Sequence, residues 1–157
     1  HMPRLDERFF TMAGAGTAVN GKRVKVRSQQ HLKQSLVCLD DYSPDGEQSS
    51  LRSAIYKQME RRSLRVRIHG SATADLCWLS AGITDCVVML SNRPWDTAAG
   101  ALMVSEAGGV LRTITGDAYS SSSTSLVATT PALLPEVLET LRVVQRTQPS
   151  AANEIPN

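Results

Sequence analysis

The chain has 157 residues, of which 41% are hydrophobic and 20% are charged, and its formal net charge at pH 7 is +2. This size and composition are typical of one soluble globular domain that buries its own core, and they leave no room for a second full domain. The net charge is too small to suggest a nucleic acid or an anionic membrane as a partner, so we interpret the arginine-rich run 61–67 as a solvated face.

The first part of the chain is predicted to form an antiparallel meander. Segments 7–12 and 22–27 have the composition of strands, and Asn20-Gly21 between them is a strong hairpin-turn signal. Residues 35–39 follow as a short apolar run suited to a buried strand.

Helices and strands are predicted to alternate from residue 50 onward. The four-residue spacing of Leu51, Ile55 and Met59 predicts an amphipathic helix over 50–62. The further elements expected are a half-buried strand over 64–69, a helix over 72–82, a strand over 85–90, a helix within 93–109, strands over 109–114 and 125–130, and a helix over 131–145. This alternation predicts an α/β fold, a layered mixed sheet with flanking helices, whose antiparallel part comes from the N-terminal meander.

The two ends of the chain are expected to lie outside this domain. Residues 1–2 are interpreted as a cloning remnant and a start residue, and 148–157 as a disordered polar tail, so the domain is expected over 3–147. No targeting peptide and no apolar run long enough to span a membrane is expected in the chain.

The cysteines indicate a reducing compartment. They are odd in number, have no C-x-x-C spacing and lie among apolar residues, as buried reduced thiols do. The three are Cys38, Cys77 and Cys86. We therefore expect a cytoplasmic protein, and we do not expect a zinc site.

Two strand-to-helix junctions, 69–72 and 91–96, are the candidate functional sites. Helix N-termini at such junctions present free N–H groups and partial positive charge to anions. We therefore expect substrate or phosphate contacts, and the residues that would make them are Gly70, Ser71, Ala72 and Asn92. Ser71 could equally be a plain helix N-cap. Asp96 could bind a metal or could simply be favoured by the helix dipole, because one carboxylate does not hold a divalent ion without partners.

Three parts of the sequence resemble the inositol monophosphatase family. The run WDTAAG at 95–100, followed by EAGG at 106–109, resembles the family's C-terminal signature. GSATAD at 70–75 and AGITD at 81–85 resemble its G-[ST]-A-A-x-[DN] helix and the segment that follows it, and residues 7–26 resemble its hairpin region. The order and spacing of these parts agree, so the chain resembles the C-terminal half of such a protein, with a layered αβαβα fold.

The resemblance implies a magnesium-dependent phosphomonoesterase. Carried over position by position, Asp96 would be a metal ligand, and Gly70, Ser71 and Ala72 would line the substrate site. Glu106 would have a structural role at the end of its helix. Magnesium in such a site neutralises the phosphate, polarises the ester and activates a water molecule.

The sequence departs from the family's pattern in two places. The family's other metal ligands come from an acidic helix residue and a D-P-x-D-G-[ST] loop, and neither motif occurs here; SPDGE at 43–47 is a solvated turn by its composition. Met89 stands where many members carry a glutamate for a sugar hydroxyl, which argues against inositol as substrate. Asn92 and Arg93 could recognise another group instead.

These departures predict that the polypeptide alone has no appreciable magnesium-dependent phosphatase activity. A strand at 7–12 with an open edge predicts either a homo-oligomer or a complex with a complementary N-terminal half. Two alternatives stay open: a non-catalytic binding or scaffold module, and a repurposed metal-free enzyme. The latter would use His69 and Asp96 as acid and base if the two junctions converge, although a histidine on a strand is more often structural.

Overall fold

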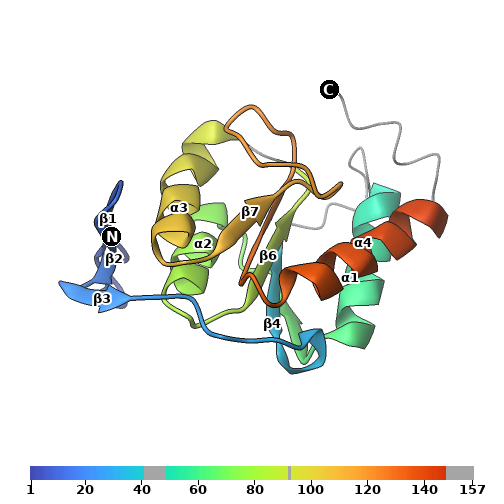
Figure 1. The fold of residues 1–157 in the computed structure, drawn as a ribbon, viewed down its shortest axis with the longest axis horizontal. Coiled ribbons are helices and arrows are strands. Elements are labelled where there is room, and N and C mark those ends of the chain that lie inside the picture. The colour runs from blue at the N-terminus through green and yellow to red at the C-terminus, as the bar shows by residue number, and fades with distance from the viewer. Residues whose placement is uncertain (41–48, 92, 148–157) are drawn as a thin grey trace.

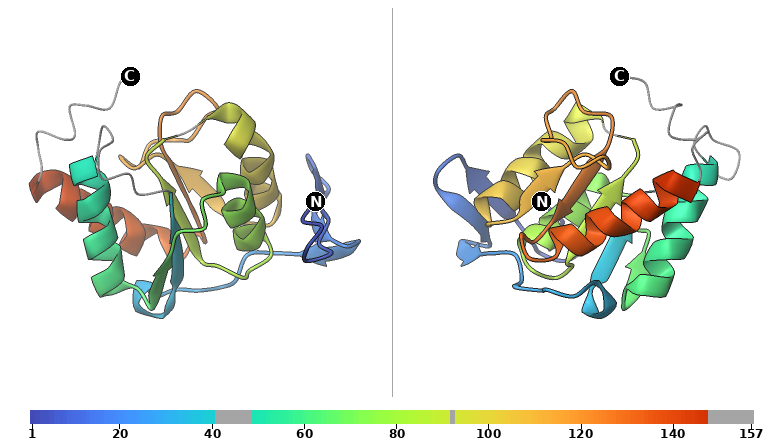
Figure 2. Two further views of the ribbon diagram at one scale, coloured as in Figure 1. Left: turned by 180° about the vertical axis from the view of Figure 1, so that it is seen from behind. Right: turned by 45° about the vertical axis from the view of Figure 1, so that its right-hand side comes forward.

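The computed structural model describes residues 1–40, 49–91 and 93–147, and it shows four layers in the order helix, sheet, helix, sheet (Figure 1). The layered α/β architecture expected from the sequence is therefore the one observed. Two helices cover one face of a five-stranded sheet, and two others cover its opposite face. The helices are α1 (Ser49–Arg62), α2 (Ala72–Ser80), α3 (Pro94–Glu106) and α4 (Leu134–Thr147), with a short 3-10 turn at Leu32–Gln34. Both views in Figure 2 show the pair α1 and α4 across the sheet from the pair α2 and α3.

The N-terminal meander forms a sheet of its own on the outer side of α3. Its strands are β1 (Phe9–Met12), β2 (Gly16–Val19) and β3 (Lys22–Val24), each antiparallel to the next. The predicted turn at Asn20-Gly21 is confirmed, since both residues have positive φ angles of 49° and 78°, as a tight hairpin requires. Strand β2 was not predicted, because its small residues lack the apolar alternation of a strand.

The five-stranded sheet has the order β5-β4-β6-β8-β7. Its strands are β4 (Leu36–Leu39), β5 (Arg65–Arg67), β6 (Cys86–Met89), β7 (Val110–Arg112) and β8 (Leu126–Thr129). Strand β4 is parallel to β5 and β6, whereas β8 is antiparallel to β6 and β7. The expectation that the meander makes this sheet mixed is therefore wrong. The antiparallel strands are C-terminal ones, and the meander belongs to a different sheet.

The core lies on both faces of the five-stranded sheet. Strands β6 and β8 are buried along their whole length, as expected for strands covered by helices on both sides. The helix predicted over 50–62 is confirmed as α1, and Leu51, Ile55 and Met59 are all buried beneath it. The predicted strand 64–69 is shorter than expected. Because β5 is an edge strand, the flanking Leu64 and Ile68 remain 55% and 40% exposed.

The cysteines are free and buried, as predicted from their apolar neighbours. Burial raises the pKa of Cys77 to about 11 and that of Cys86 to about 12, and it also raises the pKa of Cys38. The loop segment 43–47 and the tail 148–157 lie outside the described residues. Among the described helices, none combines the length and apolar character needed to cross a membrane.

Glu106 at the C-terminal end of α3 holds the meander against the helix layer. Its two carboxylate oxygens each accept a hydrogen bond of 2.8 Å, one from the backbone N–H of Gly14 and one from that of Gly16. The hydroxyl of Thr17 adds a 2.7 Å hydrogen bond to the carbonyl oxygen of Met103. These two N–H donors hold the pKa of Glu106 below its ordinary value, and the larger effect is that of Gly14. The predicted structural role of Glu106 is therefore to hold the β1–β2 turn against the end of α3 through both of its carboxylate oxygens.

We expect Glu106→Gln to destabilise the protein at neutral pH but not in strong acid. The lowered pKa means that the stabilisation is fully present above the ordinary value of 4.5 and is lost as the pH falls through the folded-state pKa. Urea unfolding followed by circular dichroism at neutral pH and near pH 3 measures this difference. Glu139→Gln on the exposed side of α4 is the control. An equal loss of stability at both pH values would show that the carboxylate charge is not the cause.

Candidate functional site

The two predicted strand-to-helix junctions converge on one cavity of about 160 Å³. Gly70, Ser71 and Ala72 line it from the start of α2, while Arg93 and Asp96 line it from the start of α3. The cavity lies at the carboxyl ends of β4 and β6, which is the usual place for ligands in open α/β sheets. The sequence argument therefore identified two walls of a single cavity.

The start of α2 supports both interpretations of Ser71. Its Oγ is the N-cap oxygen and accepts a 3.3 Å hydrogen bond from the backbone N–H of Ala74. The hydroxyl proton is not used in that contact, so it can be donated into the cavity. Gly70 has a φ of +72°, a backbone conformation that favours glycine at this turn. Thr73 ties the two walls together, because its Oγ1 donates a 2.8 Å hydrogen bond to the carbonyl oxygen of Asp96.

Asp96 is not the N-cap of its helix. The N-cap position belongs to Arg93, which makes no side-chain capping bond, and Pro94 fills the first helical position. Asp96 lies later in the first turn with an exposed side chain. Among the residues that the structure describes, its carboxylate makes no hydrogen bond or ion pair. The helix dipole favours a negative charge there, and the carboxylate remains available to a ligand.

Two further carboxylates line the cavity, and both are engaged by neighbouring groups. Asp40 accepts hydrogen bonds from the backbone N–H groups of Leu90 at 2.8 Å and Ser91 at 3.3 Å, and Arg52 approaches it at 3.4 Å. Asp75 is 2% exposed, and its Oδ1 lies 2.6 Å from Nδ1 of a histidine. The sequence analysis missed both residues. Asp40 had a usable signal, because it directly follows a buried strand at the carboxyl edge of the sheet.

The donor set of the cavity fits magnesium only in part. Mg²⁺ takes six oxygen ligands, commonly one or two carboxylates together with water and substrate phosphate. Asp96 fits as one carboxylate ligand, being exposed to the cavity and without a partner in the described parts of the chain. Asp40 and Asp75 are committed to other groups. The described residues therefore supply one clear ligand and leave the rest of the coordination to other donors.

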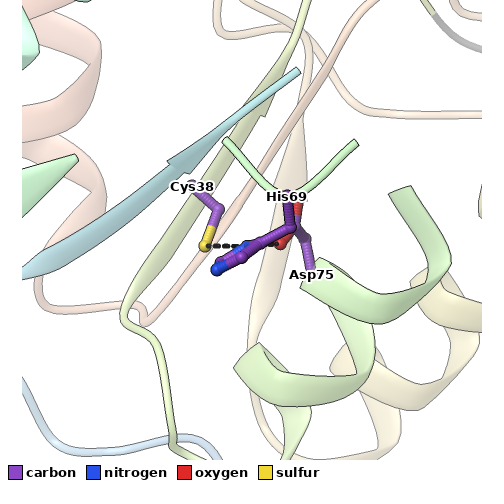
Figure 3. Close-up of side chains that lie close together, drawn as sticks. All are labelled: Cys38, His69 and Asp75. Carbon is purple, nitrogen blue, oxygen red and sulfur yellow. Dashed lines mark hydrogen bonds and ion pairs between the residues drawn. The ribbon is translucent and has the colours of Figure 1, made fainter. Parts of the chain in front are cut away.

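His69 does not join Asp96 in the cavity. Its Nδ1 lies 2.6 Å from Oδ1 of Asp75 and 3.9 Å from Sγ of Cys38 (Figure 3). Its ring meets that of Trp78 edge-on, with centroids 4.9 Å apart. These contacts favour the structural interpretation of His69, while its pairing with Asp96 as acid and base stays an untested hypothesis.

Arg93 and Met89 also line the cavity. Asn92 lies outside the described residues. Arg93 is exposed, and its guanidinium carbon lies 5.8 Å from the ring centroid of Trp95. Met89 is buried and lines the cavity. The position at which many family members carry a glutamate for a sugar hydroxyl is therefore apolar in this chain.

Comparisons with known proteins identify sequences and folds that are similar to this chain. The model of the Inositol monophosphatase family matches residues 1–146. Inositol monophosphatase 1 of Solanum lycopersicum is 34% identical over 148 residues, which are 90% of this chain and 52% of that protein. The Fructose-1,6-bisphosphatase/inositol-1-monophosphatase of Thermotoga maritima is 28% identical, over 92% of this chain and 54% of its own length.

The fold is shared with solved structures. The inositol monophosphatase from Anabaena (Nostoc) sp. PCC 7120 superposes with a TM-score of 0.81 at 26% identity, covering 89% of this chain and 58% of that one. The chain thus spans about half the length of the curated relatives it matches. Since the family model matches residues 1–146 and the fold is shared with a solved inositol monophosphatase, the chain belongs to the inositol monophosphatase family.

Proposed function

We propose that this chain provides one wall of a magnesium-dependent phosphomonoesterase site. Asp96 is the metal ligand of that wall, and Gly70, Ser71 and Ala72 contact the phosphate of the substrate. The observation that carries the proposal is the convergence of both junctions on one cavity, where the Asp96 carboxylate has no partner among the described residues. The names of the relatives, inositol monophosphatase and fructose bisphosphatase, support a small phosphorylated substrate.

Each group of the wall has a defined task in phosphate-ester hydrolysis. Magnesium bound to Asp96 would neutralise the phosphate, polarise the ester and lower the pKa of a water molecule. The first N–H groups of α2, at Ala72 and Thr73, have no intrahelical acceptor and point their positive end toward the phosphate. The hydroxyl of Ser71 donates to a phosphate oxygen while its lone pair caps the helix.

The substrate differs from inositol phosphate in its hydroxyl contacts. Met89 cannot accept a hydrogen bond from a sugar hydroxyl as a carboxylate does. Arg93 at the cavity rim, with its neighbour Asn92, recognises another polar or anionic group of the substrate instead. We therefore expect the assembled site to hydrolyse anionic sugar phosphates faster than inositol monophosphate when a panel of substrates is assayed.

The remaining metal ligands come from a complementary acidic segment or another chain. The 157 residues contain no D-P-x-D-G-[ST] loop, and Asp40 and Asp75 are already bonded. Strand β1 pairs only with β2 among the described strands, so its free edge offers a place for such a segment. Light scattering at micromolar concentration distinguishes a monomer from a homo-oligomer.

We expect the 157-residue polypeptide alone to release no appreciable inorganic phosphate. One carboxylate ligand does not hold the metal cluster that stabilises the charge of the transition state. A panel of sugar phosphates assayed at saturating magnesium measures this, with the intact Thermotoga maritima relative as the positive control. Magnesium-dependent release by the purified chain at a rate near that of the relative would refute the proposal.

A non-catalytic binding module is the second candidate, because Asp96 is the one cavity carboxylate without a partner among the described residues. The two candidates differ when the chain is combined with the acidic N-terminal half of a relative. If the chain is one wall of a phosphomonoesterase site, the assembled protein releases phosphate. A binding module assembles without gaining activity.

A further inference from the structure

A second group of ligand-type side chains adjoins the cavity, shares Asp75 with its lining, and includes none of the residues assigned to the phosphatase wall above. Cys38 on β4, His69 in the segment between β5 and α2, and Asp75 on α2 come from three separate parts of the chain (Figure 3). Their donor atoms all lie within 4.8 Å of one another. Cys38 is fully buried and Asp75 is 2% exposed, whereas the His69 side chain is 31% exposed.

The arrangement does not suit a nucleophilic triad. In such a triad the histidine contacts the thiol with one ring nitrogen and the carboxylate with the other. Here Sγ of Cys38, at 3.9 Å, and Oδ1 of Asp75, at 2.6 Å, both face Nδ1 of His69. Burial and the nearby Asp75 carboxylate also raise the pKa of the Cys38 thiol, which opposes a thiolate nucleophile when no cation lies beside the sulfur.

The same arrangement suits a metal ion, because three donors converge on one point. A tetrahedral zinc site with Zn–S of about 2.3 Å and Zn–N of about 2.0 Å places its donor atoms roughly 3.3–3.6 Å apart. The Nδ1–Oδ1 distance of 2.6 Å would need to lengthen, and the Sγ–Nδ1 distance of 3.9 Å to shorten. Changes of this size are within the reach of side-chain rotation. Asp75 also lines the cavity, so a water molecule from there can be the fourth ligand.

We propose that Cys38, His69 and Asp75 form a binding site for a thiophilic divalent metal such as Zn²⁺. Thiolate and imidazole select zinc over magnesium, so this site is distinct in ligand chemistry from the magnesium ligand Asp96. On binding, the Cys38 Sγ–H bond breaks, its proton goes to water and its electron pair forms the bond to the metal. Nδ1 of His69 binds with its lone pair, the ring proton residing on Nε2. No electron is transferred to or from the protein.

Titration of the metal-free 157-residue chain with Co²⁺ and Zn²⁺ tests the site directly. We expect one equivalent of Co²⁺ to produce visible bands of a four-coordinate ion together with a near-ultraviolet thiolate-to-cobalt charge-transfer band. Zn²⁺ abolishes both, and excess Mg²⁺ abolishes neither. The charge-transfer band is the decisive readout, since the N-terminal His1 can bind metals but cannot produce it.

Variants assign the ligands. Cys38→Val removes the charge-transfer band, and His69→Gln weakens Zn²⁺ binding by more than about tenfold. Cys86→Val is the matched control, because Cys86 is an equally buried thiol on the neighbouring strand β6 and leaves the three donors intact. Asp96→Asn keeps the band, which makes the result independent of the phosphatase proposal.

Two results overturn the metal site. One is the absence of a thiolate band in the unmodified chain at saturating Co²⁺. The other is a band of unchanged intensity in Cys38→Val. Circular dichroism confirms that each variant is folded, and the partly exposed His69 provides the decisive variant if Cys38→Val does not fold.

Discussion

Replacing Asp96 with asparagine is expected to abolish the magnesium-dependent phosphatase activity of the assembled site and to leave the fold intact. A metal ion contributes several kcal/mol to stabilisation of the charged transition state. The loss in kcat/KM is therefore expected to be at least about 10³-fold. The carboxylate has no hydrogen-bond partner among the described residues, so the free energy of unfolding should change by less than about 1 kcal/mol, the usual size of the helix-dipole contribution.

The activity is measured in a chimera that joins the N-terminal half of the Thermotoga maritima relative to this chain, and the stability in the chain itself. Asp117→Asn is the control, because Asp117 is an exposed aspartate in the loop between β7 and β8. Retention of more than a tenth of the chimera's activity in Asp96→Asn would contradict a metal-ligand role. A large loss of stability would instead assign a structural role to this carboxylate.

Gly100→Val is expected to cause the largest loss of stability among single substitutions in α3. A Cβ atom at Gly100 would lie 2.6 Å from Cβ of Leu76 and 2.7 Å from its Cδ1. Leu76 is fully buried on α2, so it has no space into which to move. Overpacking at such a contact costs about 3 kcal/mol, and the melting temperature should fall by roughly 6–12 °C.

Ala99→Val is the matched control, because position 99 is on the same helix with its side chain exposed. It introduces the same β-branched residue without the contact to Leu76. Helix propensity falls in Ala99→Val but rises in Gly100→Val, so a larger loss of stability at position 100 is due to the contact. Thermal unfolding followed by circular dichroism compares the two variants. Equal melting temperatures would mean that α2 and α3 can separate at little cost, contrary to the close packing at Gly100.

The three small residues at 98–100 of α3 have different surroundings: one packs against α2, and two are exposed to solvent. Small residues at 98–100 are compatible with the close approach of a ligand and with tight packing alike. Gly100 packs against Leu76, whereas Ala98 and Ala99 are exposed. A sequence pattern identifies the helix, but the partner of each face depends on its position in the fold.

The wall of the candidate site could be predicted because it is built from local segments. Gly70 to Ala72 and Asp96 each lie at a helix start, and helix starts are readable from turn and capping residues. The juxtaposition of Cys38, His69 and Asp75 could not be predicted. Spacing rules for zinc recognise ligands close together in sequence. Here the pairing of β4 with β5 places Cys38 opposite Arg67, two residues before His69, and α2 adds Asp75.

The direction of the strands was also beyond the sequence. Apolar periodicity indicates that 125–130 forms a strand, but it is the same for parallel and antiparallel pairing. The structure places β8 antiparallel to β6, with Val88 opposite Val127. The mixed sheet was therefore predicted correctly and attributed to the wrong strands.

The pairing of β4 with β6 has a consequence for the rate of folding. Val37 lies opposite Cys86, so pairing these two strands closes a loop that contains α1, β5 and α2. Closing a loop of this length costs chain entropy before any sheet contact compensates for it. Proteins dominated by such non-local pairs fold in milliseconds to seconds rather than microseconds. During that interval, strands 36–39 and 86–89 are both apolar and unpaired, so we expect this chain to refold more efficiently at low protein concentration.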